Sequence, residues 1–523
     1  MKSVRRLLLW SIASLALLLV GILIWSVLFF DPNDYRESIA DRIEKQTGFK
    51  LTLEGSLGLD FRFRRDAGLF AELAVEDAYL RKIADMQGVQ FAHIRELTIS
   101  LPVMQLLRLV RGERFKGAGR FSVTDLDLVP IATGLGLDGQ SFDGSDFRAL
   151  KMQGKFQSGL MFFSITDLLI AGSTTEVSGD LNFTDLHQDT KLEFSLLSPS
   201  LNIDKMVPEK ARGPLDAFEW LSLSPLLATG LRAQGVLQIG TFQAGELLFH
   251  NLNIPINSRG GVVVASPMTA DLYDGTMRID TVAQVVGQEL DFMTRQAFSE
   301  VAAGQIIEDL GLTDILRGKA DLNVIVAFSG SEYVERVRSA RGIVTLEAKA
   351  GQIRGLDIVS LLDRLAQGDF SRGGDWLGEN THTTLENVTA TLRLEDAQLV
   401  NDNLAFRAGG LEVVGQGNLS LETELLDYRL SLELDQPEIV TLLPPPFNSV
   451  GVLLPVRVAG RWDNPGIMID MPALIQMQFQ RAMGIENHLT SPAVDTQAKV
   501  LGEILEAELS VRLNQLAPGE AAQ

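Results

Sequence analysis

Hydrophobic and polar residues alternate along much of this chain. The clearest run starts at Phe49, where apolar side chains occupy odd positions and mostly polar side chains lie between them. A period of two residues is typical of a β-strand with one face buried and the other in water. The run predicts a half-buried strand, or a hairpin with a break near Gly55 or Gly58. Its further apolar members are Leu51, Leu53, Leu57, Leu59, Phe61 and Phe63.

The same alternation returns in the second half of the chain, in runs separated by breaks that contain Gly, Asn or Asp. Alternating strands joined by short turns predict an antiparallel sheet with one polar face. If roughly 25 strands stack at about 4.7–4.9 Å, the sheet is on the order of 120 Å long, so it should twist and curl into a groove or trough. The apolar members of these runs include Leu322, Val324 and Val326, then Leu411 and Val413, Leu430 and Leu432, Leu454 to Val458, and Ile467 to Met471.

Helical spacing interrupts the alternation in a few places. A short helix is expected after Asp31, ending at Gly48. Further helices are expected at residues 101–110, 214–221, 288–316 and 356–365, and an amphipathic helix at residues 496–516 of the tail.

The first apolar segment differs from all of these. No charged residue occurs from Leu7 to Phe30, and a helix of that length is about 36 Å long, enough to cross a hydrocarbon core of about 30 Å. Lys2, Arg5 and Arg6 precede it, so the positive-inside rule predicts a cytoplasmic N-terminus and one span. The alternative is a cleaved signal peptide, but the run is longer than such a core and no small-x-small site follows.

These patterns together predict a mostly β protein. One N-terminal transmembrane helix precedes a long, twisted, mainly antiparallel sheet curled into a groove, with a few short helices and a C-terminal amphipathic helix. The expected divisions are the anchor at residues 1–30, a first β region at 31–197, a Pro-rich linker with a short helix at 198–225, a second β region at 226–475 and a helical tail at 476–523.

Composition narrows the function. The 523 residues carry a net charge of −21, and such a surface repels phosphate backbones, which argues against nucleic-acid partners. The absence of cysteine removes disulfides, thiolate metal sites and cysteine nucleophiles.

No motif for catalysis stands out. The five histidines show no metal-ligand spacing, and each is best explained as a surface or satisfied residue. A glycine pattern from Gly134 to Gly139 is not followed by a helix, so it does not predict a phosphate site. A near nucleophile elbow at residues 139–143 has Asp143 in its final glycine position. We therefore expect a non-enzymatic protein with no cofactor and no metal.

A set of segments occurs in the same order as in one known family. They are FDPNDYR at 30–36, TGFKLTLEG at 47–55, LYDG at 272–275, LRGKADL at 316–322, AGQIRGLD at 350–357, LDYRL at 426–430 and LPVRVAGRWDNP at 454–465. The ordered set resembles the AsmA family of Gram-negative envelope proteins. Two departures are a more charged stretch at residues 80–88 and the tail at 496–516, and LYDG stands where the family usually has LYGG.

The resemblance implies a single-pass inner-membrane protein with a periplasmic ectodomain. It also implies kinship with chorein-type bridge-like lipid-transfer proteins, whose curved sheets carry acyl chains along an apolar groove. The implied function is outer-membrane biogenesis and phospholipid homeostasis, with membrane phospholipids as partners.

Three alternatives stay open at this point. The alternating residues could form the dry core of a β-sandwich, or the protein could be a scaffold for outer-membrane or periplasmic assembly proteins that pairs through its edge strands. An envelope hydrolase is the third. If a groove exists, the expected lining is Leu51, Leu53, Leu57, Leu59, Phe61, Phe63, Leu322, Val324, Val326, Leu411, Val413, Leu430 and Leu432.

Overall fold

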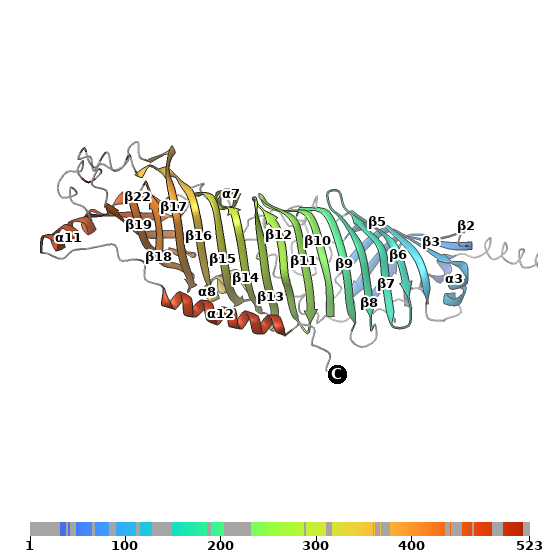
Figure 1. Ribbon diagram of the computed structural model, residues 1–523. Helices are drawn as coiled ribbons and strands as arrows, with labels where there is room; N and C mark the ends of the chain where they lie inside the picture. The colour runs from blue at the N-terminus through green and yellow to red at the C-terminus, as the bar shows by residue number, and fades with distance from the viewer. Residues whose placement is uncertain are drawn as a thin grey trace, which may run out of the picture. The chain divides into compact units, whose positions relative to one another are not determined.

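The computed structural model describes most of the chain after the predicted anchor (Figure 1). The described residues are 32–37, 40–41, 49–64, 68–82, 90–110, 116–127, 149–185, 190–202, 232–286, 289–309, 316–358, 360, 364, 367, 377–409, 411–434, 440, 452–462, 465–483 and 495–515. The predicted anchor from Leu7 to Phe30, the glycine pattern at 134–143 and the predicted helix at 214–221 lie outside them. Of the helices that the structure does describe, none has the length and apolar character to cross a membrane.

The chain divides into two compact units. Unit 1 comprises Met1–Leu160 and Ile165–Ser173, and unit 2 comprises Met161–Ser164 and Thr174–Gln523. Both are mostly β, as the alternation predicts. The predicted domain limits stay predictions, because most of the Pro-rich segment lies outside the described residues.

Unit 1 is an antiparallel sheet in which β3 pairs with β1, β2 and β4, and the order continues through β5 to β6. Its elements are η1 Pro32–Tyr35, β1 Phe49–Leu53, β2 Leu57–Arg64, β3 Gly68–Lys82, β4 Gln90–Pro102, α3 Val103–Val110, β5 Gly117–Asp127, β6 Leu150–Ser158 and most of β7 Phe162–Ala171.

The first alternating run is one interrupted strand and not a hairpin. β1 and β2 both pair with β3, and the gap between them faces a bulge in β3 at Asp77, whose φ is 43°. Across this gap Glu54 N donates to Asp77 O at 3.0 Å, and Glu76 N donates to Ser56 O at 3.1 Å. A Cβ on Gly55 would lie 2.4 Å from Glu76 O, so the break predicted near Gly55 is explained by close backbone approach.

Unit 2 is a long sheet in which successive strands from β10 to β22 pair antiparallel. Its strands are β8 Glu176–Thr184, β9 Lys191–Asn202, β10 Arg232–Ala244, β11 Leu247–Arg259, β12 Val262–Leu272, β13 Gly275–Val286, β14 Glu289–Ala302, β15 Leu316–Gly330, β16 Arg341–Leu356, β17 Leu377–Glu395, β18 Gln398–Ala408, β19 Leu411–Ser420, β20 Leu425–Leu434, β21 Val452–Arg461 and β22 Gly466–Ile469. Its helices are α7 Ala303–Asp309, α8 Tyr333–Ser339, α11 Met471–Ala482 and α12 Thr496–Asn514.

One pair of strands departs from the antiparallel rule. β9 and β10 are parallel, with Phe194 opposite Gly235 and Leu196 opposite Leu237. A parallel pair needs a long crossover connection, and residues 203–231 of the sequence separate the two strands. The strand β9 itself reaches Asn202, inside the segment that the prolines marked as a linker.

The turn between β12 and β13 explains one departure from the family pattern. Tyr273 and Asp274 both have positive φ, at 46° and 62°, between the paired residues Leu272 and Gly275. A two-residue hairpin turn of this kind needs positive φ at both positions, where Gly, Asn and Asp are best tolerated. Asp274 can therefore occupy the turn position at which the resembled family usually has glycine.

The helix predictions have mixed outcomes. The described residues between 32 and 41 are helical, and α12 confirms that the tail forms a helix. α3 confirms the helix at 101–110 in part, since Leu101 and Pro102 end β4. The helix at 356–365 is confirmed in part, since the described residues Ile358, Ser360 and Arg364 are helical.

The helix at 288–316 is wrong over most of its length. β14 fills residues 289–302, and only Ala303–Asp309 is helical. The pairing of β14 with β15 shifts between Phe298 and Val301, where Glu300 has a φ of 53°. The bulge inserts one extra residue into the strand, so Phe298 and Val301 are three residues apart instead of two or four. A spacing of three between apolar residues is also typical of a helix, which explains the wrong prediction.

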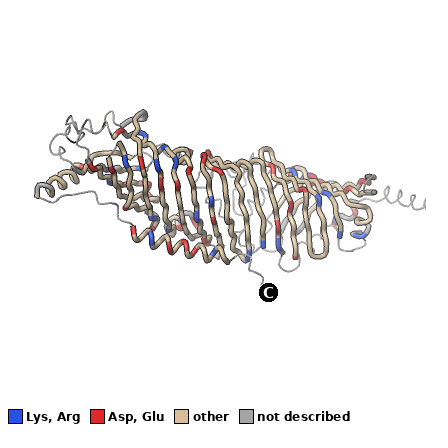
Figure 2. The backbone as a smooth tube through the Cα atoms, in the orientation of Figure 1, with Lys and Arg blue, Asp and Glu red and all other residues tan. Residues whose placement is uncertain are grey.

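Each strand of unit 2 presents one apolar and one polar face. On β15, Leu322, Val324, Val326 and Phe328 point to one side, and charged or amide residues such as Asn323 point to the other. Charged residues are spread along the strands in Figure 2. We name the two sides of the unit 2 sheet the apolar face, which carries Val324, and the polar face, which carries Asn323.

The C-terminal helix α12 packs on the polar face. Ala498, Leu505 and Leu509 are at most 2% exposed and form a cluster with Val264, Val282, Met293, Ile325, Ala327 and Ile343. Figure 1 shows α12 lying across one end of these strands. Its buried side chains pack against the apolar residues that interrupt the polar face.

Candidate functional site

The apolar face changes character along unit 2. From β8 to β16 most of its large side chains are only half-buried, although each lies in register with an apolar or small neighbour on the next strand. A small buried cluster of Ile239, Leu252, Ala270 and Met277 interrupts this stretch on β10 to β13. The half-buried set includes Leu181, Phe183, Phe194, Leu237, Phe292, Leu322, Val324, Val326, Phe328 and Val344.

Two aromatic arrangements shape the surface of this stretch. Phe292 and Phe328 lie opposite each other and stack, with ring centroids 4.8 Å apart and planes 23° apart. The Phe194 ring lies against Gly235, where an added Cβ would be 2.5 Å from its Cγ. A ring that lies over a glycine follows the sheet, so it adds apolar area without filling the space above the strands.

The same face is filled from β17 to β21. Leu385, Leu411, Val413 and Leu454 are each at most 1% exposed. Three residues from outside this stretch of the sheet complete the cluster, namely Ile358, Val440 and Leu474, at 2–4% exposure.

Hydrogen bonds between backbone and side chains fix the segments that carry Ile358 and Leu474. Ile358 N donates to Thr383 Oγ1 at 3.0 Å, and Thr383 is itself buried. Leu474 is fixed by the start of α11, where Ala473 N donates to Asp470 Oδ1 at 3.1 Å and Asp470 N donates to Pro455 O at 3.0 Å. This end of the apolar face is therefore a packed core.

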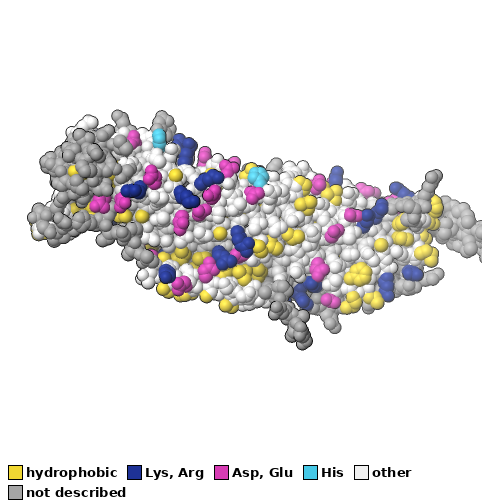
Figure 3. All heavy atoms as spheres, viewed as in Figure 1, with side chains coloured by type: hydrophobic (Ala, Val, Ile, Leu, Met, Phe, Trp, Pro, Cys, Tyr) yellow, Lys and Arg dark blue, Asp and Glu magenta, His cyan; other side chains and the backbone are white. Residues whose placement is uncertain are grey.

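Ion pairs fasten α12 to the polar face behind the half-buried stretch. The pairs are Arg295–Glu506 at 2.9 Å, and Arg341–Glu508, Arg512–Asp291 and Arg393–Asp495 at 2.8 Å each. The side chains of Arg393 and Asp495 are only 11% and 7% exposed, and Asp495 also caps α12 by accepting from Gln497 N and Ala498 N. Acidic, basic and apolar side chains are interspersed over this region in Figure 3.

A buried carboxylate supports the Arg295 side chain. Burial of Asp280 opposes its charge, but Ser266 Oγ donates to it at 2.5 Å and Arg295 pairs with it at 2.6 Å. The hydrogen bonds and the nearby guanidinium outweigh burial, so the pKa of Asp280 is lowered. Asp280 thus stays ionised and keeps Arg295 positioned toward Glu506.

Unit 1 carries an apolar face of its own. Leu57 is 4% exposed and packs with Val75 and Ala78, whereas Phe63, at the far end of β2, is 73% exposed. A second cluster of Ala92, Val123, Leu126 and Leu150 lies on β4 to β6. The apolar surface of unit 1 therefore contains two small buried clusters, with half-buried side chains such as Leu59 and Phe61 beside them and an exposed one at Phe63.

A side chain next to the predicted anchor pairs with the first edge strand. Asn33 Oδ1 accepts from Leu57 N at 3.0 Å, and Asn33 Nδ2 donates to Leu57 O at 3.4 Å. Arg36 donates to the same Oδ1 at 2.8 Å. The two bonds to Leu57 copy the pairing that a neighbouring strand would give, so the chain after Phe30 is tied directly to β2.

The predicted lining residues fall into three environments. Leu322, Val324 and Val326 are half-buried on the apolar face of unit 2, whereas Leu411, Val413 and Leu432 belong to the filled end and Leu430 packs against it. In unit 1, Leu51, Leu53, Leu59 and Phe61 are half-buried, Leu57 is buried and Phe63 is exposed. The structure therefore does not join all of them in one continuous lining of equal exposure.

Sequence reasoning missed several members of this face. Phe292 was assigned to a helix, although Leu290, Phe292 and Phe298 keep even spacing and could have indicated a strand. Phe194, Leu192 and Leu196 on β9 also alternate and were overlooked. The sequence pattern does not indicate that Ile358, Val440 and Leu474 pack on this face, because only the fold brings them to the sheet.

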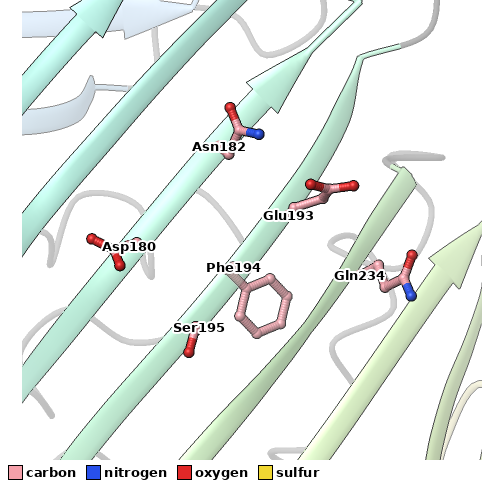
Figure 4. Close-up of a pocket in the computed structure, with 6 residues that line it drawn as sticks. All are labelled: Asp180, Asn182, Glu193, Phe194, Ser195 and Gln234. Atoms are coloured by element: carbon pink, nitrogen blue, oxygen red, sulfur yellow. The ribbon is translucent and has the colours of Figure 1, made fainter.

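The polar faces contain two shallow hollows of about 400 Å³ each. One, in unit 2, is lined by Asp180 and Asn182 of β8, Glu193 and Ser195 of β9, and Gln234 of β10 (Figure 4). Lys191 donates to Glu193 at 2.6 Å, and this hydrogen bond lowers the pKa of the carboxyl.

The other hollow lies in unit 1 and is also lined by paired charges. Lys155 pairs with Asp167 at 2.5 Å, and Glu72 pairs with Arg62 at 2.7 Å. Cross-strand pairs of this kind are typical of the solvated face of a sheet. Across the part of the chain that the structure describes, no group of three or more His, Asp and Glu side chains could hold a metal ion.

Of the three histidines that the structure describes, one packs against neighbouring side chains and two are exposed. His93 stacks on Tyr79 at 4.4 Å between ring centroids, and its Nε2 lies 3.3 Å from Asp77 Oδ1. His250 and His382 are exposed, and His187 and His488 lie outside the described residues.

The fold and the site define a class: a mostly β protein whose sheet presents a long apolar face that is filled at one end only. The family model of the AsmA family matches residues 1–110. The match covers the N-terminal segment of the chain, which is therefore similar to the AsmA family over these residues. No match was found among curated proteins or among solved structures.

Proposed function

We propose that this protein binds the acyl chains of phospholipids on the apolar face of unit 2, between β8 and β16. It would act as a single-pass inner-membrane protein with its bulk in the periplasm, in outer-membrane biogenesis. The observation that carries the proposal is the row of half-buried apolar side chains, which recurs on neighbouring strands from β8 to β16, is interrupted by one small buried cluster on β10 to β13, and gives way to a packed core from β17 onward.

The physical argument concerns apolar surface left in water. Soluble proteins rarely leave a contiguous apolar surface larger than a few hundred Å² uncovered unless it binds something. Each acyl methylene that leaves water contributes about 0.8 kcal/mol, so a chain lying over Leu322, Val324 and Val326 needs no specific polar contact. The charged headgroup would stay in water beyond the strand ends.

The attachment near the predicted anchor supports a membrane location. Asn33 ties the residues that follow Phe30 to β2, and Phe63 leaves its ring exposed on the same strand. An anchor at residues 7–30 would therefore hold unit 1 close to a bilayer. Transfer along the face would be passive, because an acyl chain exchanges one half-buried apolar neighbour for another of the same kind.

The test places one charge on either side of β15. Val324→Asp puts a carboxylate on the apolar face, and Asn323→Asp puts the same carboxylate one residue away on the polar face. We expect the full-length protein, purified in detergent, to lose most of its copurifying phospholipid in V324D and to keep it in N323D, measured by lipid extraction and mass spectrometry.

A photoreactive residue at position 326 gives the second readout. It should crosslink to acyl chains in the parent and in N323D, and not in V324D. Absence of phospholipid from the parent protein, or equal lipid in V324D and N323D, contradicts the proposal.

The scaffold alternative needs a free edge strand for β-augmentation. β22 spans only Gly466–Ile469 and leads at once into α11, and Asn33 occupies the backbone of Leu57 on β2. β22 therefore offers only a short edge, and the start of β2 is already occupied by Asn33, so these observations favour lipid binding over strand exchange.

A further inference from the structure

The helix α11 carries a row of exposed apolar side chains, which continues to the residue after its end. Met471, Ile475, Phe479 and Met483 are 42%, 64%, 68% and 59% exposed. Successive residues of a helix are about 100° apart, so steps of four residues drift by about 40° and the row covers a sector of about 120°. That is the width of an amphipathic face, and large residues such as Phe479 are rarely left in water together without a partner.

The opposite side of α11 is fixed to the sheet. Leu474 is 4% exposed within the cluster that fills the apolar face, where Ile467 and Ile469 of β22 pack against it. Asp470 caps the helix and is itself bonded to β21 through Pro455 O. The exposed row therefore lies on a helix that is fixed to the sheet. Figure 1 shows this helix at the end of the unit 2 sheet.

Charge distinguishes α11 from the rest of the protein. The chain contains 67 acidic residues, yet Met471–Ala482 contains none, and its single charged residue is Arg481. The other exposed helical row, Val500, Ile504 and Val511 on α12, lies among Glu503, Glu506 and Glu508. An acid-free amphipathic helix suits an anionic lipid surface, from which an acidic one is repelled.

We propose that α11 docks on the surface of a phospholipid bilayer and inserts Met471, Ile475, Phe479 and Met483 among the acyl chains. This goes beyond acyl-chain binding by the sheet, because it assigns a separate membrane contact to the end of unit 2. Since Leu474 connects the helix to the end of the apolar face, docking brings that end of the face to the bilayer.

The experiment compares two matched double variants. Ile475→Asp with Phe479→Asp changes α11, and Ile504→Asp with Val511→Asp changes the exposed row of α12. Both pairs add two negative charges to exposed helical positions, so any general repulsion from anionic vesicles is the same. Each full-length protein is held by its N-terminal segment in a nanodisc and mixed with vesicles of phosphatidylethanolamine and phosphatidylglycerol, and co-flotation is measured.

We expect the α11 variant to reduce co-flotation by more than about tenfold, because two large apolar side chains no longer leave water. The α12 variant should change it less than about twofold. Equal loss in both variants, or unchanged flotation in the α11 variant, overturns the inference. Unchanged thermal unfolding midpoints show that both variants are folded.

The absence of cysteine allows a second readout. An environment-sensitive fluorophore on Met483→Cys should brighten when vesicles are added, and the same fluorophore on Val511→Cys should not. Brightening without vesicles, together with a dimer mass by light scattering that I475D/F479D abolishes, would assign the row to a second copy of the chain and overturn the membrane contact. Lipid bound at position 326 is scored separately, so loss of vesicle docking and loss of groove binding are distinguishable.

Discussion

Two stretches of one sheet face use the same sequence pattern in different ways. From β8 to β16 most large side chains of the apolar face of unit 2 are half-buried, apart from the small cluster on β10 to β13, and from β17 to β21 the face is filled. The alternation of Leu322, Val324 and Val326 is indistinguishable from that of Leu411 and Val413. What differs is coverage, because Ile358, Val440 and Leu474 belong to the cluster that fills the second stretch.

The polar face shows the reverse arrangement. Behind β12 to β16, α12 packs so closely that Met293, Leu505 and Leu509 are each 0% exposed. A sheet that leaves one face in water needs burial on the other to be stable. Packing of α12 on the polar face thus stabilises the half-buried stretch. The core on the apolar face stabilises the filled stretch.

The largest expected effect comes from truncating one leucine in each stretch. Leu411→Ala removes a side chain that is 0% exposed, and we expect a loss of about 2–5 kcal/mol in the free energy of unfolding. Leu322→Ala removes a half-buried side chain and should cost less than about 1.5 kcal/mol, because little cavity is left. Urea denaturation followed by circular dichroism measures both, and equal losses would mean that the two stretches are packed alike.

An intermediate effect should separate a covered ion pair from an exposed one. Asp495→Ala leaves the 11% exposed Arg393 without its main partner and removes the cap of α12, for an expected cost of about 2–4 kcal/mol. Asp427→Ala breaks the Arg457 pair of the filled stretch, whose side chains are 41% and 43% exposed, and should cost less than about 1 kcal/mol. Hydrogen exchange should speed up on α12 in D495A alone; slow exchange there would show that α12 does not depend on this pair.

The smallest effect concerns acid. The pKa of Asp280 is lowered in the folded protein from its unfolded value of about 3.9, so its contribution is present above that value and is lost as the pH falls through the folded pKa. Below about pH 4 we therefore expect the protection of α12 amides, relative to the intrinsic exchange rate at the same pH, to fall while amides of β19 and β21 stay protected. Asp280→Asn should remove this acid-dependent step, and an unchanged step in D280N would assign it to another carboxylate.

Much of the fold could be predicted from local pattern. The alternation predicted β2, β15, β19, β20 and β21, and the amphipathic spacing predicted α12. The misassigned β14 shows the limit, because a single bulge at Glu300 changes the spacing that the pattern relies on. Met471 likewise continued an alternating run, although it begins α11.

The candidate site was less accessible to sequence reasoning. Whether Val324 is half-buried or fully buried depends on which distant segments the fold brings to the apolar face. Its neighbours along β15 do not reveal that exposure. The same holds for Val413, which is buried in a cluster that includes Leu474, a residue distant from it in the sequence.

The sequence by itself determined the regularly alternating strands, their two faces, the tail helix and the acid-rich charge, because each depends on composition or on residues close together in the chain. Tertiary structure decided which stretch of the apolar face is filled, where α12 lies, and that β9 and β10 run parallel. The physical reason is that burial is a property of contacts between distant segments, whereas a period of two residues is a property of one strand alone.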